Sequence, residues 1–317
     1  MLSGWMSLPA WERAGKGTGD DHRDRSSRDA DGTDGRAGAF AAVGVAMTLI
    51  ASVTGERFRD IPSFEIEVAI LGRTEIRGIG AGFSRASALE LVVYLALHPA
   101  GTANDTWATA LWPDRLMAPA TLHSTASAAR RALGHSSSGL DHLPRSHGRL
   151  RLAPTVTTDW QRFIRLAASP DPGCWTQALG LVRGRPFEGL RNAEWTVLEG
   201  FAAEVEERVA ELAGRVADDH LDAGQPRAAA TAARRGLLVS PYDERLYRRL
   251  LVCADQEGHP AGVERVMAEL LSQVDVTPSG GRGETFDLAM VHPKTASLYR
   301  TLSRRRRPEA RPMVTRQ

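Results

Sequence analysis

The order of apolar and polar side chains predicts a first region of short strands and helices. Residues 64–78, FEIEVAILGRTEIRG, alternate apolar with polar positions, which is the pattern of two short half-buried strands separated at Gly72. Apolar residues then recur three and four positions apart, and prolines stand near the ends of the runs. We therefore expect helices over residues 85–97, 104–112 and 119–133.

The residues around these helices complete the pattern of a winged helix. Asn104 is expected to cap the second helix, and Gly134 stands just past the third. Residues 142–154, HLPRSHGRLRLAP, hold two extended pieces around residues 146–148, which predicts a hairpin. Strands, three helices and a hairpin in this order are typical of a winged helix with an N-terminal sheet, here residues 64–160.

The second half of the chain is predicted to be helical and repetitive. After a linker at residues 167–173, the segment GQPRAA (224–229) returns 34 residues later as GHPAGV (258–263). This is the period of tetratricopeptide repeats, whose helix pairs bury their apolar faces only by stacking on neighbours. We place this repeat domain at residues 173–303, with an acidic side at residues 197–223. The predicted fold class is therefore mainly α.

The two ends of the chain have compositions that do not favour a core. Residues 1–38 are charged and rich in Gly, which predicts a disordered tail, and residues 304–317 form a basic tail. Residues 39–60 contain an apolar segment and a linker, but the uncharged run 39–53 is shorter than the roughly 20 residues of a membrane span. A marginal membrane segment and a packed helix both stay open, and we expect no membrane partner.

Composition fits a soluble globular protein. The chain is 42% hydrophobic and 25% charged, and its net charge of +2 gives no case for a polyanion partner. Only Lys16 and Lys294 are lysines among the 40 basic residues, so arginine clusters carry less weight here. Arginines nonetheless outnumber acids in residues 115–165, which supports DNA binding. Cys174 and Cys253 are expected to be free thiols in a reducing cytoplasm.

Several segments, in this order, carry a family resemblance. They are LVVYLALHPAG, ALWPD, SAARRALG and GRLRL in the first half, and VRGRPFEGL, RRGLLVSPYDERLYRRLL and EGHPAGVERVM in the second. Over about residues 64–302 the chain resembles the bacterial transcriptional activator domain proteins of the Streptomyces antibiotic regulatory protein family. FDLAMVHPKTASLYRTL is most similar to the LysM-associated branch, although the chain shows no LysM repeat.

The resemblance implies a fold, a function and partners. It implies an OmpR-like winged helix-turn-helix followed by an all-α, tetratricopeptide-like domain. The implied function is a cytoplasmic transcriptional activator that binds double-stranded promoter DNA and contacts RNA polymerase. The helical repeats would make this contact, or would bind a second copy of the chain as a homo-oligomer.

The predicted helix 119–133 is the expected DNA reader, because the second helix of a helix-turn-helix enters the major groove. Four apolar residues form one buried stripe: Leu122, Ala126, Ala129 and Leu133. Ser124 and Arg131 then lie nearly opposite that stripe, flanked by Ala128 and by small polar residues. Arg130 lies at its side, within reach of a phosphate or the wing. The expected DNA-binding residues are Thr121, Ser124, Ser127, Arg130, Arg131, Arg145 and Arg149.

A second interpretation stays open beside DNA binding. These arginines are then solvated, and the winged helix is a protein-interaction module that no longer binds DNA. The apolar run at residues 39–53 would be compatible with a membrane-associated signalling scaffold of that kind.

The sequence contains no motif of an enzyme or a cofactor site. It lacks a phosphate-binding GxxxxGK[ST], a GxSxG elbow and an HExxH pair, so we expect neither catalysis nor a cofactor. His135, His142 and His147 stand near Asp141, but no cysteine joins them, and we expect no metal. Four aromatic residues are expected to be core: Trp107, Trp112, Phe187 and Trp195.

Overall fold

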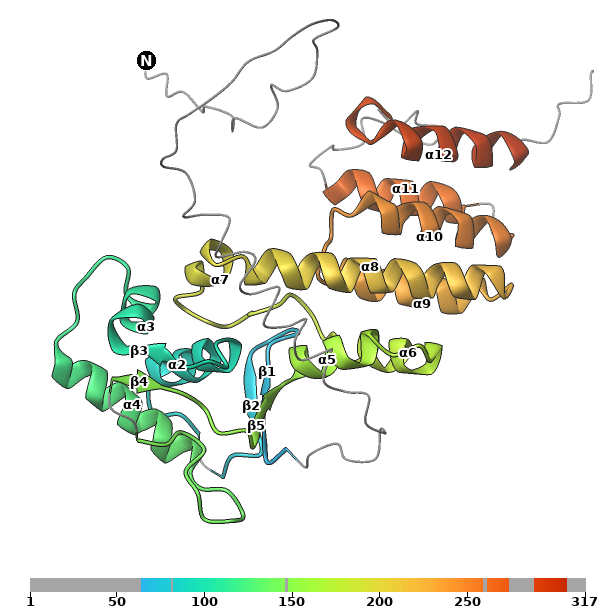
Figure 1. Cartoon of the computed structure of the whole chain (residues 1–317). Coiled ribbons are helices and arrows are strands. Elements are labelled where there is room, and N and C mark those ends of the chain that lie inside the picture. The colour runs from blue at the N-terminus through green and yellow to red at the C-terminus, as the bar shows by residue number, and fades with distance from the viewer. Residues whose placement is uncertain (1–63, 81, 146–147, 259–260, 274–287, 307–317) are drawn as a thin grey trace, which may run out of the picture. The chain divides into compact units, whose positions relative to one another are not determined.

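The computed structural model describes residues 64–80, 82–145, 148–258, 261–273 and 288–306. The predicted disordered tail (1–38), the apolar segment with its linker (39–60) and most of the basic tail (304–317) lie outside these residues. The fold is mainly helical with small sheets (Figure 1).

The first half has the predicted order of strands and helices. The elements are β1 Ile66–Ala69, β2 Glu75–Arg77, α2 Ala86–Leu97, β3 Thr102–Ala103, α3 Asn104–Leu111, α4 Pro119–Leu133, β4 Arg149–Leu150 and β5 Val156–Thr158. The alternation in residues 64–78 is confirmed as strands, because β1 and β2 pair antiparallel with Val68 opposite Ile76. Their sheet has the order β2–β1–β5, and β5 runs parallel to β1.

The predicted hairpin at residues 142–154 is found only in part. Its two arms meet where the amide of Ala153 donates to the carbonyl of His142 at 2.8 Å, but β4 pairs antiparallel with β3, with Leu150 opposite Thr102. The strand before α3 therefore supplies the ladder hydrogen bonds of β4. Residues 146–147, at the predicted turn, lie outside the described residues.

The helix ends agree with the prediction except at Asn104. α2 ends before His98, and α4 begins at Pro119 and ends before Gly134, whose φ is 69°. The N-cap of α3 is Ala103, without a side-chain hydrogen bond, and Asn104 is already helical. The Asn104 amide oxygen instead accepts from Trp107 Nε1 at 3.2 Å, because the indole donor of this buried tryptophan needs a partner.

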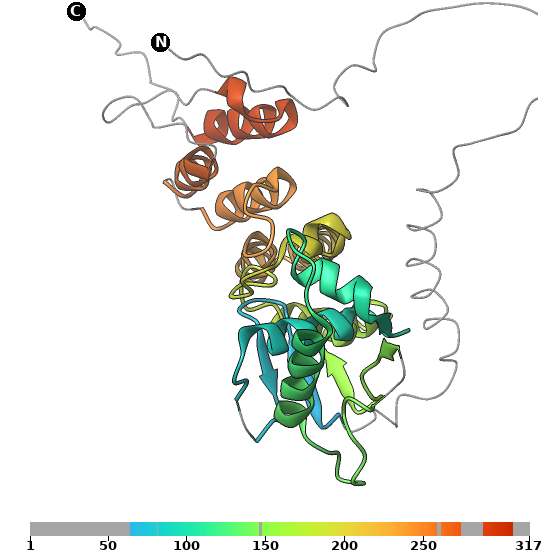
Figure 2. The ribbon, with the colours of Figure 1, turned by 90° about the vertical axis from the view of Figure 1, so that its left-hand side faces the viewer.

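The second half consists of helix pairs. The elements are α5 Asp159–Ala167, α6 Pro172–Gly180, α7 Glu194–Leu198, α8 Phe201–Asp222, α9 Pro226–Leu237, α10 Glu244–Gln256, α11 Gly262–Gln273, the 3-10 turn η2 Leu288–Met290 and α12 Pro293–Arg306. The 34-residue repeat is visible as two hairpins, α8–α9 and α10–α11, which stack on each other (Figures 1 and 2). Each hairpin turns at a glycine with positive φ, Gly224 and Gly258, which is why the motif repeats there.

The predicted linker at residues 167–173 is a short, packed turn between α5 and α6. Ser169 is buried, and its carbonyl accepts from Trp175 Nε1 at 2.7 Å. Buried apolar residues form one cluster that extends from Ile66 to Leu302. The two halves therefore share packing, and the domain bounds 64–160 and 173–303 stay a prediction.

The contact between the first hairpin and α10 depends on a residue without a side chain. A Cβ added at Gly236 would lie 2.6 Å from Ala213 Cβ on α8 and 2.6 Å from Leu246 Cδ1 on α10. Gly236→Ala should therefore lower the free energy of unfolding by about 1 kcal/mol, since overpacking outweighs the gain in helix propensity. Thermal unfolding of the full chain measures it. Gly180→Ala, at a helical position with nothing within 4 Å, is the control and should lose nothing.

The structure bears on the predicted free cysteines and on the question of a membrane segment. Cys174 and Cys253 are free, as expected, and Cys253 is buried, which raises the pKa of its thiol to about 11. Within the described residues, no helix has the length and apolar character needed to cross a membrane. The apolar run at 39–53 lies outside them.

Candidate nucleic-acid interface

The helix α4 is held in place by its apolar stripe. Leu122, Ala126, Ala129 and Leu133 are all buried, as predicted, and α4 packs on α2. Ala128 is also buried, although the pattern placed it beside the exposed face. The buried face is wider than four residues because Thr125 and Ala132 also turn inward, which leaves a narrow exposed strip.

The exposed strip of α4 carries the predicted polar residues. Ser127 and Arg131 are exposed, while Thr121 and Ser124 are half-buried. Arg131 Nε lies 3.4 Å from the Ser127 carbonyl, one turn back along the helix. The guanidinium thus lies along the surface of α4, where it is available to a ligand that approaches this face.

Arg130 differs from its neighbour, because it is half-buried and braces the following loop. Its Nε donates to the carbonyl of Leu143 at 3.1 Å. Burial lowers the pKa of Arg130, and repulsion from Arg145 lowers it further, while Asp141 acts in the opposite sense. Arg145 is itself exposed.

Arg149 connects β4 to the loop before β3. Its Nη2 donates to the carbonyl of Gly101 at 2.6 Å, and the rest of the residue is exposed. The structure thus holds Arg130 and Arg149 by separate contacts to the backbone, while Arg145 is exposed and its charge acts on Arg130.

One basic residue at this face was not predicted. Arg85 stands at the N-cap of α2, and its Nη1 donates to Ser124 Oγ at 3.0 Å. Ser124 Oγ in turn donates to the carbonyl of Thr121 at 2.9 Å. The only signal in the sequence is an arginine just before a helix, which says nothing about a contact with a residue 39 positions away.

The histidines of the loop after α4 have structural partners. His135 Nδ1 lies 2.7 Å from Asp141, and the buried His142 contacts Thr155 Oγ1 at 2.8 Å. His147 lies outside the described residues, and among those described no group of three metal-ligating side chains occurs.

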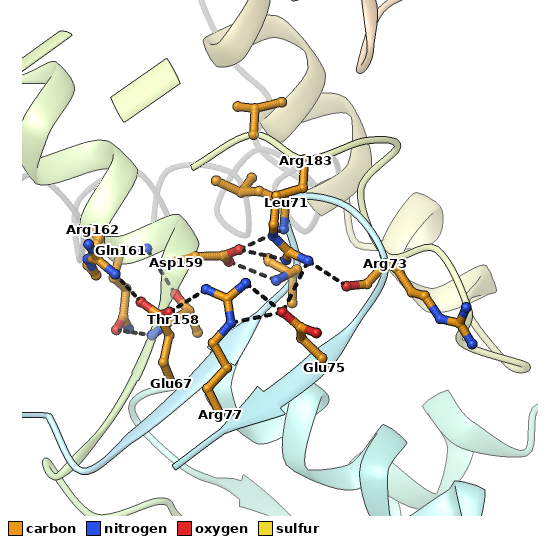
Figure 3. Close-up of polar contacts among 12 residues, drawn as sticks. Glu67, Leu71, Arg73, Glu75, Arg77, Thr158, Asp159, Gln161, Arg162 and Arg183 are labelled. Carbon is orange, nitrogen blue, oxygen red and sulfur yellow. Dashed lines mark hydrogen bonds and ion pairs between the residues drawn. The ribbon is translucent and has the colours of Figure 1, made fainter. Parts of the chain in front are cut away.

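A buried carboxylate joins the first half to the segment after α6 (Figure 3). Asp159, at the start of α5, accepts from the backbone amides of Ile70 at 2.7 Å and Leu71 at 3.0 Å. Arg183 Nη2 donates to the same carboxylate at 3.2 Å, and Arg183 Nη1 donates to the carbonyl of Arg73 at 3.0 Å. Burial raises the pKa of Asp159, even though the hydrogen bonds that it accepts from Ile70, Leu71 and Arg183 favour its charged form. We call Asp159 and Arg183 with these backbone contacts the strut.

The backbone strengthens the strut on the side of the second half. The amide of Arg183 donates to the carbonyl of Leu71 at 2.7 Å, and the amide of Phe187 donates to Ile70 at 3.0 Å. Arg235 on α9 donates to the carbonyl of Val182 at 2.9 Å. The segment 181–190 is therefore bonded both to the strand region and to the helix pairs.

Residues 167–276 match the family model of the bacterial transcriptional activator domain. The chain carries a bacterial transcriptional activator domain.

A solved structure has a similar fold over a longer part of the chain than this domain. One solved structure, Mycobacterium tuberculosis EmbR in complex with a low-affinity phosphopeptide, is 21% identical with a TM-score of 0.52. The match covers 77% of this chain and only 66% of the EmbR chain. No curated protein matches the sequence. The predicted activator domain is thus confirmed, while the similarity to the LysM-associated branch stays a prediction.

The activator domain also contacts the first half through α2. The buried Glu90 accepts from the amide of Arg191 at 3.1 Å and from Asn192 Nδ2 at 3.2 Å. Trp195, predicted as core, is 2% exposed and meets the ring of Tyr94 edge-on at 4.9 Å. Burial, together with the nearby charge of Glu199, raises the pKa of Tyr94. Buried contacts thus fix the activator domain to the helix on which α4 packs.

Proposed function

We propose that the chain is a DNA-binding transcriptional regulator of the activator type. Residues 64–160 form a winged helix-turn-helix in this proposal, in which α3 and α4 are the two helices of the motif and α4 enters the major groove. The single observation that carries it is the structure of α4, an apolar face packed on α2 and an opposite strip with an exposed arginine, beside an activator domain.

The side chains around α4 take different tasks in this proposal. Arg131, with Ser124 and Ser127, faces the base edges, because arginine contacts guanine with two hydrogen bonds and serine allows close approach. Arg145 and Arg149 contact phosphates, with Arg85 as an addition to the predicted set. Arg130 positions the loop that carries Arg145. Thr121, at the start of α4, contacts the DNA backbone in this proposal.

The proposed protein partner is RNA polymerase, or a second copy of the chain, at the helix pairs. Stacked helix pairs offer a surface for another protein. Leu116, in the loop that leads from α3 into α4, is fully exposed. An apolar side chain at that place is available to a protein bound to the same DNA. The proposed location is the cytoplasm, where bacterial promoters are, and the chain acts by binding and not by catalysis.

Selection of bound sequences from random double-stranded DNA tests this function. The full chain is used, at a stated salt concentration, because phosphate contacts make affinity depend on salt. Enrichment of a short direct repeat is expected. If no sequence is enriched and Arg131→Ala leaves binding unchanged, the fold is a protein-interaction module, and the arginines are solvated.

Arg145→Ala should weaken binding to all DNA sequences by a similar factor. A phosphate contact carries no sequence information, so preference should be kept, and the slope of log affinity against log salt should fall by about one. Titrations at several salt concentrations measure this. A change of preferred sequence would mean that Arg145 reads a base and would contradict the assignment.

A further inference from the structure

A second surface feature lies on the activator-domain side of the first half. A hollow of about 550 Å³ opens between α3 and α7. Its lining combines carboxylates with apolar and aromatic side chains, among them Asp105, Glu194, Trp195, Leu198 and Glu199. No residue of α4 lines it, so it is separate from the proposed DNA face.

The hollow has a negative wall. Asp105 on α3 and Glu194 on α7 are exposed, and neither has an ion-pair partner among the described residues. Glu199 is engaged, since it accepts from Tyr94 at 3.1 Å and lies 2.9 Å from His98 Nε2. First-turn acids also stabilise helix ends, so the two carboxylates alone do not define a site.

A further observation points to a ligand. Leu198, which lines the hollow, is a large apolar side chain that is 80% exposed, and the adjacent Val197 is 71% exposed. Trp195 also lines the hollow, but it is 2% exposed and its Nε1 is buried, so it contributes packing and not a hydrogen bond to a ligand.

We propose that this hollow binds a basic peptide segment of a partner protein. An arginine or lysine side chain of the segment pairs with Asp105 and Glu194, and an apolar side chain packs on Leu198. The carboxylates would repel a phosphate backbone, which excludes nucleic acid from this surface. The site goes beyond the proposed DNA binding and does not depend on it.

Peptide selection with the full chain tests the proposal. A phage-displayed library of random 12-residue peptides is selected on the immobilised protein, and enriched peptides are synthesised and titrated. We expect enriched sequences to combine Arg or Lys with an apolar residue. The double variant Asp105→Asn/Glu194→Gln should weaken their binding at least tenfold, and Leu198→Ser should weaken it several-fold.

The controls separate this site from general attraction between charges. Glu211→Gln/Asp219→Asn removes the same charge from exposed positions on α8 and should leave peptide binding unchanged. Leu198→Ser changes an exposed residue, so it tests the site even if the double variant unfolds. Failure to enrich peptides, enrichment of sequences without basic residues, or equal loss in both double variants would overturn the proposal. DNA selection is measured separately, so failure of either function is recognised.

Discussion

Replacing Asp159 by alanine should lower the free energy of unfolding by roughly 3 kcal/mol. The carboxylate is 1% exposed and accepts from Ile70, Leu71 and Arg183, so its removal leaves two buried amides and a guanidinium without this acceptor. Denaturant unfolding of the full chain measures the change. The loss should affect both halves together, because the strut joins them.

The matched control lies on the exposed side of the same network (Figure 3). Arg77 pairs with Glu67 and Glu75, and 43% of its side chain is exposed. Arg77→Ala should therefore cost less than about 1 kcal/mol. Similar losses for Arg77→Ala and Asp159→Ala would contradict a structural role for the strut.

The dependence on pH gives Asp159 a separate signature. Its pKa is raised in the folded protein, so the folded state holds the proton more tightly than the unfolded state. The stability from this group is full below its unfolded pKa and is lost as pH rises through the folded pKa. The free energy of unfolding of the parent chain, measured relative to that of the Asp159→Asn variant, should therefore fall as pH rises from acid toward neutral.

Arg131→Ala should cost about 1–3 kcal/mol of DNA-binding free energy and relax preference at one base pair. Among the described residues, the Arg131 guanidinium is exposed and forms a hydrogen bond only within its own helix α4. A bidentate contact to guanine would be lost with it. Binding titrations against the selected site and its single-base variants measure both effects.

Two variants separate base reading from charge. Arg131→Lys keeps the charge and loses the planar pair of donors, so it should recover affinity without recovering preference. Arg300→Ala removes one charge from the exposed surface of α12 and should leave DNA binding unchanged. Full recovery by lysine would show that Arg131 contacts only phosphate.

The features predicted well are those that neighbouring residues determine. The buried stripe of α4 follows from apolar residues three and four positions apart, and its ends follow from Pro119 and Gly134. The helix pairs follow from a 34-residue repeat whose turns need glycine. In each case adjacent residues favour the local backbone conformation, which packing on neighbouring helices then stabilises.

The features missed depend on residues far apart in the chain. The pairing of β4 with β3, the bond from Arg85 to Ser124 and the strut each join segments that only the tertiary fold brings together. Ala128 was misplaced for a related reason, since the width of a buried face depends on what packs beside it. Sequence periodicity gives a helix its buried side but not the neighbours at the margin of that side.

The turn of four residues between α5 and α6 has a consequence for promoter layout under the proposed function. With the strut and the α2 contacts, it joins the activator domain to the helix on which α4 packs. DNA rotates once in about 10 base pairs, so a site shifted by half a turn presents the bound protein on the opposite side of the double helix. A rigid regulator therefore reaches its partner only from sites spaced by whole turns, whereas one on a flexible tether would tolerate intermediate spacings.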